Sequence, residues 1–320
     1  MTSAVPVGRT VHVKVPATSA NLGPGFDTLG LALSSYDELD VTAVSATGAR
    51  VTVHGVGEGE VPTDETNLVV QAIAYTFKDQ QQEMPGIDVT ARNIIPHGRG
   101  MGSSGAAIVS GIMAAKGLLD GIVELDADDL LRIATEMEGH PDNVAPALFG
   151  GLTIAWVEPS GADDAPLRPR SKRLMVHRGV SPVVFVPEHQ MSTRLARSLQ
   201  PQSVPHEDAV FNVSRSSLLI AALIQSPELL FAATEDKLHQ NYRAAAMPQT
   251  SELIALLRSH GYAAVVSGAG PSVLVLCSDP AQRLEAAELV EKEAHSPWRA
   301  HMLAVDFKGA TVGIASRGTA

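Results

Sequence analysis

The spacing of hydrophobic residues predicts an alternation of strands and helices along most of the chain. Apolar and polar residues alternate at 11–15, which is typical of a half-buried strand, and Pro16 is expected to end it. Further strands are predicted at 38–44, 51–54, 87–94, 152–157, 182–186, 262–267, 273–277, 301–307 and 311–316. Helical spacing of apolar residues predicts helices at 67–78, 106–119, 128–138, 191–197, 208–225, 251–258 and 281–294.

This order of elements predicts an α+β fold in two domains. In the second half of the chain, strands and helices follow a split β-α-β order, which is consistent with a ferredoxin-like sandwich. The clearest change in composition lies at 158–170, where Pro, Gly, Asp, Ala and charged residues gather. We therefore predict a first domain at residues 1–165 and a second domain at residues 166–320.

Composition and charge narrow the range of expected partners. The 320 residues are 45% hydrophobic and 18% charged, which is typical of a globular protein with an ample core. The formal net charge of -11 argues against nucleic acid or an anionic membrane surface as a main partner, although a local site can still hold a nucleotide. No apolar run has transmembrane length, and residues 1–10 lack a signal-peptide pattern. These features predict a cytoplasmic protein, with its single cysteine, Cys277, buried in an apolar strand.

A glycine-rich decapeptide, PHGRGMGSSG at 96–105, carries the strongest chemical signal in the sequence. Its alternating glycines permit positive φ and let a ligand approach the backbone closely. The helix predicted after it presents free N–H groups and a partial positive charge to the loop. This combination suits an anion, most often a phosphate, although a glycine-rich surface turn has the same composition.

Two well-known phosphate loops fit this decapeptide poorly. A P-loop requires a lysine after its glycines, and none follows here. Residues 100–105 match the G-x-G-x-x-G fingerprint of an NAD(P)-dependent dehydrogenase. However, a helix start at 126–130 lies where that fold needs a second strand ending in an acid. The dehydrogenase is therefore kept as the alternative from a different enzyme class.

Two other places along the chain stand out for their chemistry. Glu138 lies in the last turn of a predicted helix, where its charge opposes the helix dipole by up to about 1 kcal/mol. It is therefore either solvated or faces a cation. Asn21 and Asp27 lie beside a strand end in a stretch rich in Gly, Pro and Ser, which is either a connecting loop or a substrate contact.

The decapeptide resembles the ATP loop of the GHMP small-molecule kinases, whose usual pattern is P-x-x-x-G-L-G-S-S-A. The chain departs from that pattern at Met101 and Gly105, and both changes leave the backbone role intact. The segment SGAGPS at 267–272 resembles the third GHMP motif. VPATSANLGPGFD at 15–27, HPDNVAP at 140–146 and LHQNYR at 238–243 resemble segments of the homoserine kinases within this family. The similar segments span nearly the whole chain in the family's order.

The resemblance implies a fold and an activity. The fold is the two-domain GHMP kinase fold, with a ribosomal-protein-S5-domain-2-like N-terminal domain and a ferredoxin-like C-terminal domain. The activity is ATP-dependent phosphorylation of the hydroxyl of L-homoserine in threonine biosynthesis, with Mg²⁺ as cofactor. The family also suggests a homodimer. A GHMP kinase acting on another small alcohol, such as mevalonate, is the nearer alternative.

The resemblance also assigns residues to the nucleotide and the metal ion. Ser104 and Glu138 are expected to hold Mg²⁺, which would account for the unusual position of this carboxylate. The positions expected at ATP are Asn67, Pro96, Gly98, Arg99, Gly100, Met101, Gly102, Ser103, Ser104, Gly268 and Gly270.

The charged ends of homoserine divide its expected partners by chemistry. Arg197 and Arg243 suit the carboxylate, because a guanidinium binds this group bidentately. Arg194 lies three residues before Arg197 on the same predicted helix face and competes with it. Asp27 and Asp142 suit the ammonium group.

The reacting hydroxyl has its own set of expected neighbours. Asn21, Asn143 and Thr193 are expected close to it, and the candidate catalytic residues are Asp142, Asn143 and Asn21. Asp142 is the best candidate for a base, if the reaction uses one. The homoserine kinases are usually considered to lack that base, so Asp142 is either a base or only a substrate ligand.

Overall fold

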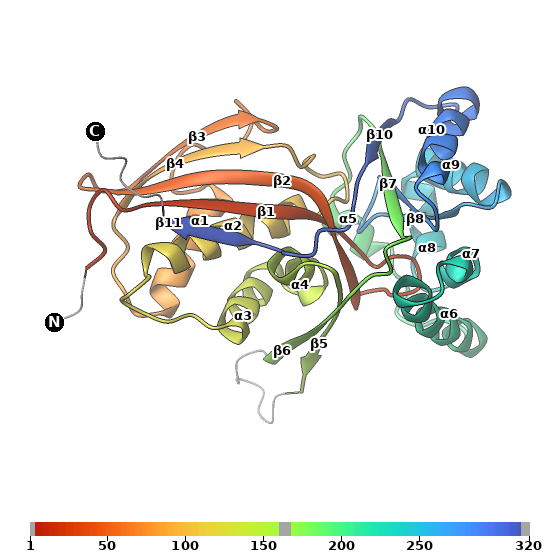
Figure 1. Ribbon diagram of the computed structural model, residues 1–320, viewed down its shortest axis with the longest axis horizontal. Helices are drawn as coiled ribbons and strands as arrows, with labels where there is room; N and C mark the ends of the chain where they lie inside the picture. Colours follow the sequence, from red (N-terminus) through yellow and green to blue (C-terminus); the bar gives the residue numbers. More distant parts are fainter. Residues whose placement is uncertain (1–3, 160–167, 315–320) are drawn as a thin grey trace.

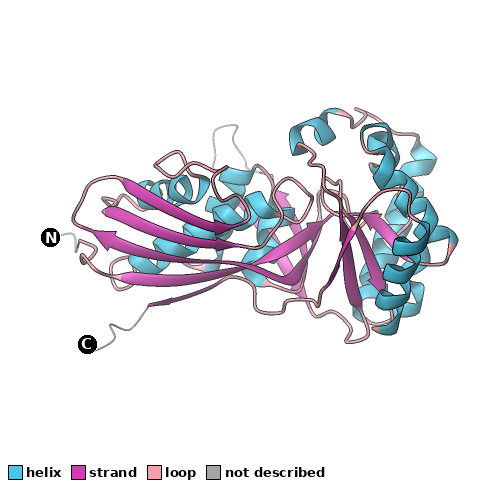
Figure 2. Ribbon diagram, turned by 90° about the horizontal axis from the view of Figure 1, so that it is seen from above, coloured by secondary structure: helices cyan, strands magenta, loops and turns pink. Residues whose placement is uncertain are grey.

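The computed structural model describes residues 4–159 and 168–314 and contains two β-sheets lying side by side (Figures 1 and 2). The larger sheet contains β1 (Thr10–Ala20), β2 (Leu29–Val44), β3 (Ala49–Gly55), β4 (Gly86–Asn93), β5 (Leu152–Glu158), β6 (Arg168–Leu174) and β11 (Thr311–Ile314). Its order is β11-β1-β2-β4-β3, and β5 pairs with β2 and β6. All these pairs are antiparallel except β3 with β4.

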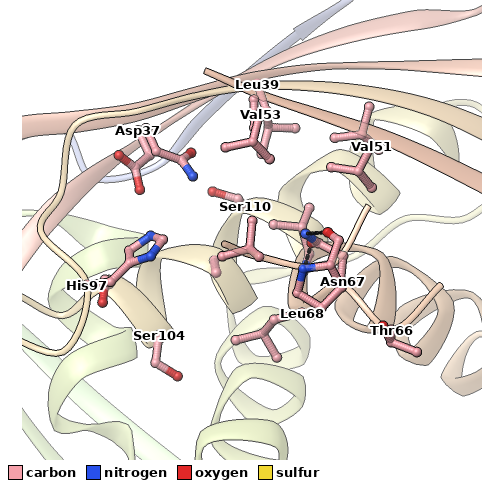
Figure 3. A pocket seen from close by; sticks show the side chains of 18 residues that line it. Asp37, Leu39, Val51, Val53, Thr66, Asn67, Leu68, His97, Ser104 and Ser110 are labelled. Atoms are coloured by element: carbon pink, nitrogen blue, oxygen red, sulfur yellow. Dashed lines mark hydrogen bonds between the residues drawn. The ribbon is translucent and has the colours of Figure 1, made fainter. Parts of the chain in front are cut away.

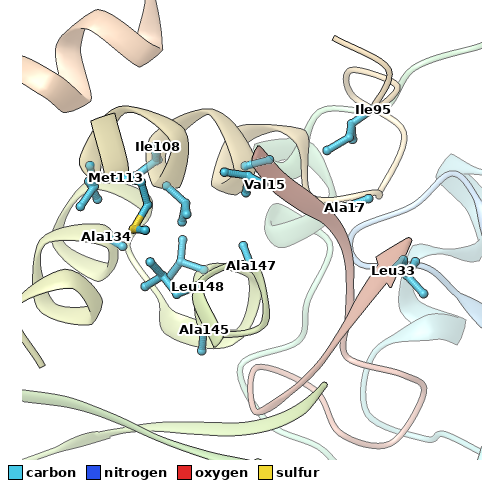
Figure 4. Packing of buried hydrophobic residues seen from close by; sticks show 14 of the residues in the cluster. Val15, Ala17, Leu33, Ile95, Ile108, Met113, Ala134, Ala145, Ala147 and Leu148 are labelled. Atoms are coloured by element: carbon cyan, nitrogen blue, oxygen red, sulfur yellow. The ribbon is translucent and has the colours of Figure 1, made fainter. Parts of the chain in front are cut away.

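One face of the larger sheet is buried under helices, and the other carries charges. Along β2, the side chains of Leu39 and Val41 are buried. The alternating residues Glu38 and Asp40 point to the outer face, where they form ion pairs with Lys14 and Arg92. Figure 4 shows core residues of the helical side, such as Ile108 and Leu148. The covering helices are α1 (Leu68–Asp79), α2 (Ser103–Leu118), α3 (Ala127–Glu138) and α4 (Pro141–Phe149).

The smaller sheet has the antiparallel order β10-β7-β9-β8, and this confirms the predicted ferredoxin-like arrangement. Its strands are β7 (Ser181–Val186), β8 (Ala263–Val266), β9 (Val273–Cys277) and β10 (Arg299–Met302). Along β9, Val273 and Val275 pack in one cluster with residues of α9 (Pro248–Ser259) and α10 (Ala281–Glu293). Leu274 and Leu276 belong to the main core with residues of α6 (His206–Ile224) and α7 (Leu230–Ala233). Two short helices, α5 (Thr193–Ser198) and α8 (Gln240–Arg243), connect these elements.

The α+β prediction is confirmed, but several details differ from the sequence-based expectation; β2, for example, begins at Leu29 and not at 38, and the last strand of the smaller sheet lies at Arg299–Met302 and not at 301–307. The first strand does not end at Pro16 but continues to Ala20, with a register shift between Pro16 and Ala17 that accommodates the proline. α4 was not predicted, because Pro146 lies inside it. The helix tolerates this proline because its missing N–H leaves only the Asp142 carbonyl without a helical partner. β6 was also missed, because it is a charged edge strand without apolar alternation.

The predicted domain boundary at 165/166 lies outside the described residues and stays a prediction. Strand pairing nevertheless assigns two segments beyond it to the larger sheet, because β6 forms a hairpin pair with β5 and β11 returns to pair with β1 (Figure 1). The chain therefore enters the smaller sheet at β7 and leaves it after β10. In the described parts of the chain, no helix combines the length and apolar character needed to cross a membrane.

Candidate active site

The glycine-rich loop precedes the N-terminus of α2, and its shape requires glycine at two positions. Gly98, Gly100 and Gly102 all have positive φ, between 64° and 71°. A Cβ on Gly100 would lie 2.1 Å from the Ser267 carbonyl oxygen, and one on Gly102 would lie 1.9 Å from Thr18 Oγ1. The loop therefore fits closely against its neighbours and directs its backbone toward the helix N-terminus, where an anion is favoured.

Hydrogen bonds join this loop to both sheets. The Thr18 N–H of β1 donates to the Met101 carbonyl (3.1 Å), and the Ser267 hydroxyl donates to the Gly100 carbonyl (2.6 Å). Met101 is fully buried in the core, so it offers a ligand only its backbone. Gly105, the departure from the usual alanine, has room for a methyl group, because the nearest atoms to its Cβ position lie 3.5 Å away.

The Arg99 side chain does not point to the phosphate side of the loop. Its guanidinium donates to the backbone carbonyls of His97, Pro187 and Glu188. Arg99 and Pro96 line a hollow between the end of β4 and the smaller sheet, separate from the cavity beside α2. The prediction that these two residues bind ATP is therefore limited to their backbone atoms.

A cavity of about 310 Å³ lies between the larger sheet and the helices α1 and α2, and it opens beside Ser103 and Ser104 (Figure 3). Its sheet wall is apolar and includes Leu39, Val51 and Val53. Asn67 also lines the cavity, but its side-chain amide is hydrogen-bonded to the backbone. It accepts from the Val69 N–H (3.0 Å) and donates to the Pro62 carbonyl (2.8 Å). Such a cavity with an apolar wall, beside an anion site, suits a purine base.

Ser104, which lines this cavity, forms a hydrogen bond with Glu138. The Ser104 hydroxyl donates to Glu138 Oε2 at 3.0 Å, which joins the first turn of α2 to the last residue of α3. Burial raises the pKa of Glu138, and the Ser104 hydrogen bond opposes that rise. The two oxygens are hard ligands of the kind that Mg²⁺ prefers. In the described parts of the chain no cluster of three or more metal-binding side chains occurs, so a metal ion here would need ligands from the nucleotide.

The predicted catalytic residues Asp142 and Asn143 lie together in the first turn of α4. Asp142 is only 2% exposed and forms a short hydrogen bond with His140 Nδ1. Burial lowers the pKa of His140, but the hydrogen bond and charge of Asp142 outweigh it, so the pKa is raised. Asn143 accepts a hydrogen bond from Thr18 Oγ1 (3.1 Å) and thus lies beside Gly102 of the glycine loop.

Two predicted substrate residues of opposite charge pair with each other. Arg197 Nη2 lies 3.0 Å from Asp27 Oδ1, and both side chains are about 40% exposed. The Arg197 charge also acts on Glu138 and His140, which places it at the same centre. Arg194 is exposed and makes no such contact among the described residues, so the geometry favours Arg197 over Arg194.

Arg243 is an unusual buried cation. It is 2% exposed, and within the described chain no carboxylate pairs with its guanidinium. One nitrogen donates weakly to the Gly268 carbonyl (3.4 Å), and the group lies 5.2 Å from the ring centre of Phe26. Burial lowers the pKa of Arg243, while the nearby charge of Asp27 opposes this. An anionic ligand is the partner that such a group lacks.

The side chain of Asn21 links two loops of the site by hydrogen bonds. Its Nδ2 donates to the Gly268 carbonyl (2.9 Å), and its Oδ1 accepts from the Asp27 N–H (2.9 Å). It thereby ties the Asp27 loop to the predicted nucleotide residues Gly268 and Gly270, which both have positive φ. Its expected contact with the hydroxyl stays a prediction. Thr193 opens α5, and its side chain lies outside the described part of the structure.

Sequence reasoning missed several residues that shape this site. Asp37 and His97 line the nucleotide cavity, where Asp37 accepts hydrogen bonds from the N–H groups of Ile94 and Ile95. His239 is fully buried, with its Nε2 at 2.7 Å from the Gly23 carbonyl, and its ring stacks on Phe26 at 4.8 Å. His97 and His239 lie in family-like segments, which could have indicated a role, whereas Asp37 lies in none of them.

Comparisons with known proteins agree with this geometry. Family models of the GHMP kinases N terminal domain and the GHMP kinases C terminal domain match residues 67–151 and 219–296. A homoserine kinase from Clavibacter michiganensis subsp. michiganensis is 72% identical over 320 residues, which is 100% of this chain and 99% of that relative. The chain belongs to the homoserine kinases of the GHMP family.

Solved structures place the fold in the same family. The homoserine kinase from Cytophaga hutchinsonii superposes with a TM-score of 0.79 at 27% identity, covering 95% of this chain and 97% of that one. A mevalonate kinase from L. major, 14% identical, has a TM-score of 0.68 and covers 95% and 98%, which shows a shared fold alone. The two-domain GHMP kinase fold expected from the resemblance is thus confirmed, and as a GHMP kinase the chain uses ATP.

The dehydrogenase alternative is wrong. The G-x-G-x-x-G match lies after β4, whose sheet is antiparallel apart from the β3–β4 pair. A dinucleotide fold needs a mostly parallel sheet with the acid at the end of the following strand. In this homoserine kinase family member, α2 leads to α3 instead, and no strand intervenes within residues 103–138.

Proposed function

We propose that this protein transfers the γ-phosphoryl group of ATP to the hydroxyl of L-homoserine. The observation that carries this proposal is Arg243, a buried cation without a carboxylate partner in the described chain, beside the Asp27–Arg197 pair. An α-amino acid carries the two charges that these groups would bind. Arg243 and Arg197 would hold its carboxylate, and Asp27 would hold its ammonium group.

The nucleotide is proposed to lie with its base in the apolar cavity and its phosphates on the loop at 98–104. The residues present at the phosphate end fit Mg²⁺, because Ser104 and Glu138 offer a hydroxyl and a carboxylate 3.0 Å apart. When bound, the metal ion would neutralise charge that develops on the transferred phosphoryl group. The loop N–H groups and the α2 N-terminus are proposed to orient the phosphates and keep them in line with the acceptor.

Asp142 is proposed to bind the acceptor rather than to remove its proton. One of its oxygens already bonds to His140, whose raised pKa favours the imidazolium form beside it. Because this oxygen is occupied by the imidazole, the geometry favours a role for Asp142 as a charged partner of the acceptor over a role as its base. Changing Asp142 to Asn should therefore raise the KM for homoserine more than it lowers kcat. A large fall in kcat with unchanged KM would identify Asp142 as a base.

The test of the function is an assay of ADP release with Mg-ATP and each of L-homoserine, mevalonate, L-threonine and L-serine. Metal-dependent turnover with L-homoserine alone supports the proposal. Turnover with mevalonate in its place would assign the site to another GHMP activity, and nucleotide binding without turnover on any of the four would remove the substrate assignment.

A cytoplasmic location is proposed from the sequence features, and a homodimer is proposed from the family resemblance alone. Cell fractionation would test the first, and light scattering coupled to size-exclusion chromatography would test the second.

A further inference from the structure

Arg99 lies within the phosphate loop, but its side chain points away from the cavity beside α2 and contacts the connection that follows β7. Its Nε donates to the Pro187 carbonyl (2.9 Å) and its Nη2 to the Glu188 carbonyl (2.5 Å). Its Nη1 donates to the His97 carbonyl at 3.1 Å, which closes the loop on itself. Each nitrogen of the planar guanidinium is thus occupied by a backbone oxygen, a geometry that a single ammonium group cannot reproduce.

Two of the carbonyls that Arg99 binds, those of Pro187 and Glu188, belong to the connection between β7 and α5. The same connection touches the loop again at Gly98, whose carbonyl accepts from the Met191 N–H at 2.9 Å. Met191 then packs with Ala196 in a small cluster that also contains Met247 and Val266. Ala196 is fully buried in α5, and the next residue is Arg197, which pairs with Asp27.

A continuous set of contacts therefore runs from the nucleotide loop to the acceptor arginine. It consists of backbone hydrogen bonds at one end, a buried apolar cluster in the middle and an ion pair at the other end. The Arg197–Asp27 pair is the half-exposed part of this set, so its position depends on how α5 is held. A shift of the loop on binding phosphates would be transmitted to α5 through these contacts.

We propose that Arg99 is a positioning residue that couples the nucleotide site to the acceptor site. It acts through residues 187–191 and α5 on Arg197, and it does not itself contact the phosphates. This inference rests on the proposed function, because it takes Arg197 as an acceptor ligand. It predicts that binding of one substrate strengthens binding of the other, and that this mutual effect depends on the three hydrogen bonds of Arg99.

The experiment measures the dissociation constant of L-homoserine with and without a saturating non-hydrolysable ATP analogue and Mg²⁺. For the unchanged protein we expect homoserine to bind at least about 5-fold more tightly when the analogue is present. Two variants, Arg99→Met and Arg99→Lys, should reduce this ratio to about 1, while each binds the analogue alone about as tightly as the unchanged protein. The Lys variant matters because it keeps the charge and loses the fork of donors.

A matched control is Arg178→Met, which removes one charge at an exposed residue with no hydrogen bond in the described chain and should leave the ratio unchanged. Three results would overturn the inference: a ratio near 1 in the unchanged protein, a ratio retained in both Arg99 variants, or analogue binding lost in Arg99→Met and restored in Arg99→Lys. The last result would make Arg99 a phosphate ligand through its charge. Near-normal analogue binding also shows that a variant is folded.

The proposed function fails separately from this inference. If the unchanged protein turns over L-homoserine but the variants keep the ratio, only the coupling role of Arg99 is wrong. If the unchanged protein neither binds nor phosphorylates L-homoserine, the acceptor assignment itself is wrong, and the coupling role falls with it.

Discussion

The nucleotide region and the acceptor region of this protein recognise their ligands in different ways. The nucleotide region offers mainly backbone and apolar surface: a glycine loop at a helix N-terminus and a cavity walled by residues such as Leu39 and Val53. The acceptor region offers charged side chains, with Asp27, Arg197 and Arg243 drawn from three distant segments. We propose that the first region selects its ligand by shape and by the field of the helix, and that the second region selects its ligand by charge.

This difference has a structural cost that falls on the acceptor region. A buried guanidinium such as Arg243 must be surrounded by groups that keep its position fixed. The loop around Asp27 contains three non-glycine residues at positive φ, which is an unfavourable conformation for them. The buried side chains of Asn212 and His239 hold this loop in place by hydrogen bonds to the carbonyls of Pro24 and Gly23. The nucleotide loop is also held by hydrogen bonds, from Thr18 and Ser267, but its glycines adopt positive φ without strain.

The largest effect is expected where the two regions meet. Glu138→Gln removes the carboxylate proposed to hold Mg²⁺ at the phosphates, and kcat should fall by about 10²–10³-fold, because this charge acts on the transition state. Glu136→Gln, two residues earlier on α3, is the matched control and should keep kcat within about twofold, because Glu136 pairs instead with Arg132. Steady-state kinetics would decide, and equal kcat in both variants would contradict the metal assignment.

Removing the buried cation should impair the acceptor region alone. Arg243→Met is expected to raise the KM for homoserine by about 100-fold, which corresponds to the 2–3 kcal/mol of a charged hydrogen-bonded pair, with the KM for ATP nearly unchanged. Arg194→Met, which removes an exposed charge on α5, serves as the control. A comparable rise in both KM values would mean that Arg243 supports the whole site rather than the acceptor.

The nucleotide region should respond to backbone shape. Gly102→Ala places a Cβ against Thr18 Oγ1 at a residue with φ of 71°, and strain of about 1–3 kcal/mol should raise the KM for ATP by about 10-fold or more. Gly105→Ala is its counterpart, because the space beside Gly105 accepts a methyl group and alanine favours a helix by about 1 kcal/mol. Urea unfolding should show this second variant to be more stable. Equal losses of ATP affinity in both would refute the close fit of the loop.

The smallest effect concerns the pH dependence of stability in the acceptor region. The pKa of His140 is raised above its ordinary value, so its pairing with Asp142 stabilises the folded chain fully below about pH 6.5. That contribution is lost as the pH rises through the raised pKa. The free energy of unfolding of the unchanged protein should therefore exceed that of His140→Gln by more at pH 6 than at pH 9. Parallel values for the two proteins across this range would contradict the pairing.

The same comparison explains how much of the structure the sequence could predict. The phosphate loop is local, so its glycines and the following helix were visible in ten consecutive residues. The apolar periodicity likewise predicted the main helices and the ferredoxin-like order of the second half. The acceptor charges were named individually from the family resemblance, but their pairing could not be predicted, because it depends on contacts between distant segments. The 3.0 Å approach of Arg197 to Asp27 spans 170 positions, and nothing local encodes it.

Two further features could not be predicted for related reasons. Arg99 was assigned to the nucleotide because it lies inside the loop, but its side chain leaves on the other side and bonds to residues 88 and 89 positions away. His239 belongs to the LHQNYR segment that resembles the homoserine kinases, but nothing in that segment indicates that its ring is fully buried against Phe26. In both cases the residue can be singled out in the sequence, but the orientation and burial of its side chain depend on the tertiary fold.

The most direct test of the central claim compares acceptors that differ by one charge. The measurement is kcat/KM with Mg-ATP for L-homoserine, for 4-hydroxybutanoate, which lacks the ammonium group, and for 3-amino-1-propanol, which lacks the carboxylate. Recognition by charge predicts a loss of about 10–100-fold for each analogue, larger for the missing carboxylate because it leaves the buried Arg243 unpaired. Values of kcat/KM within about twofold for all three acceptors would show that shape, and not charge, selects the acceptor.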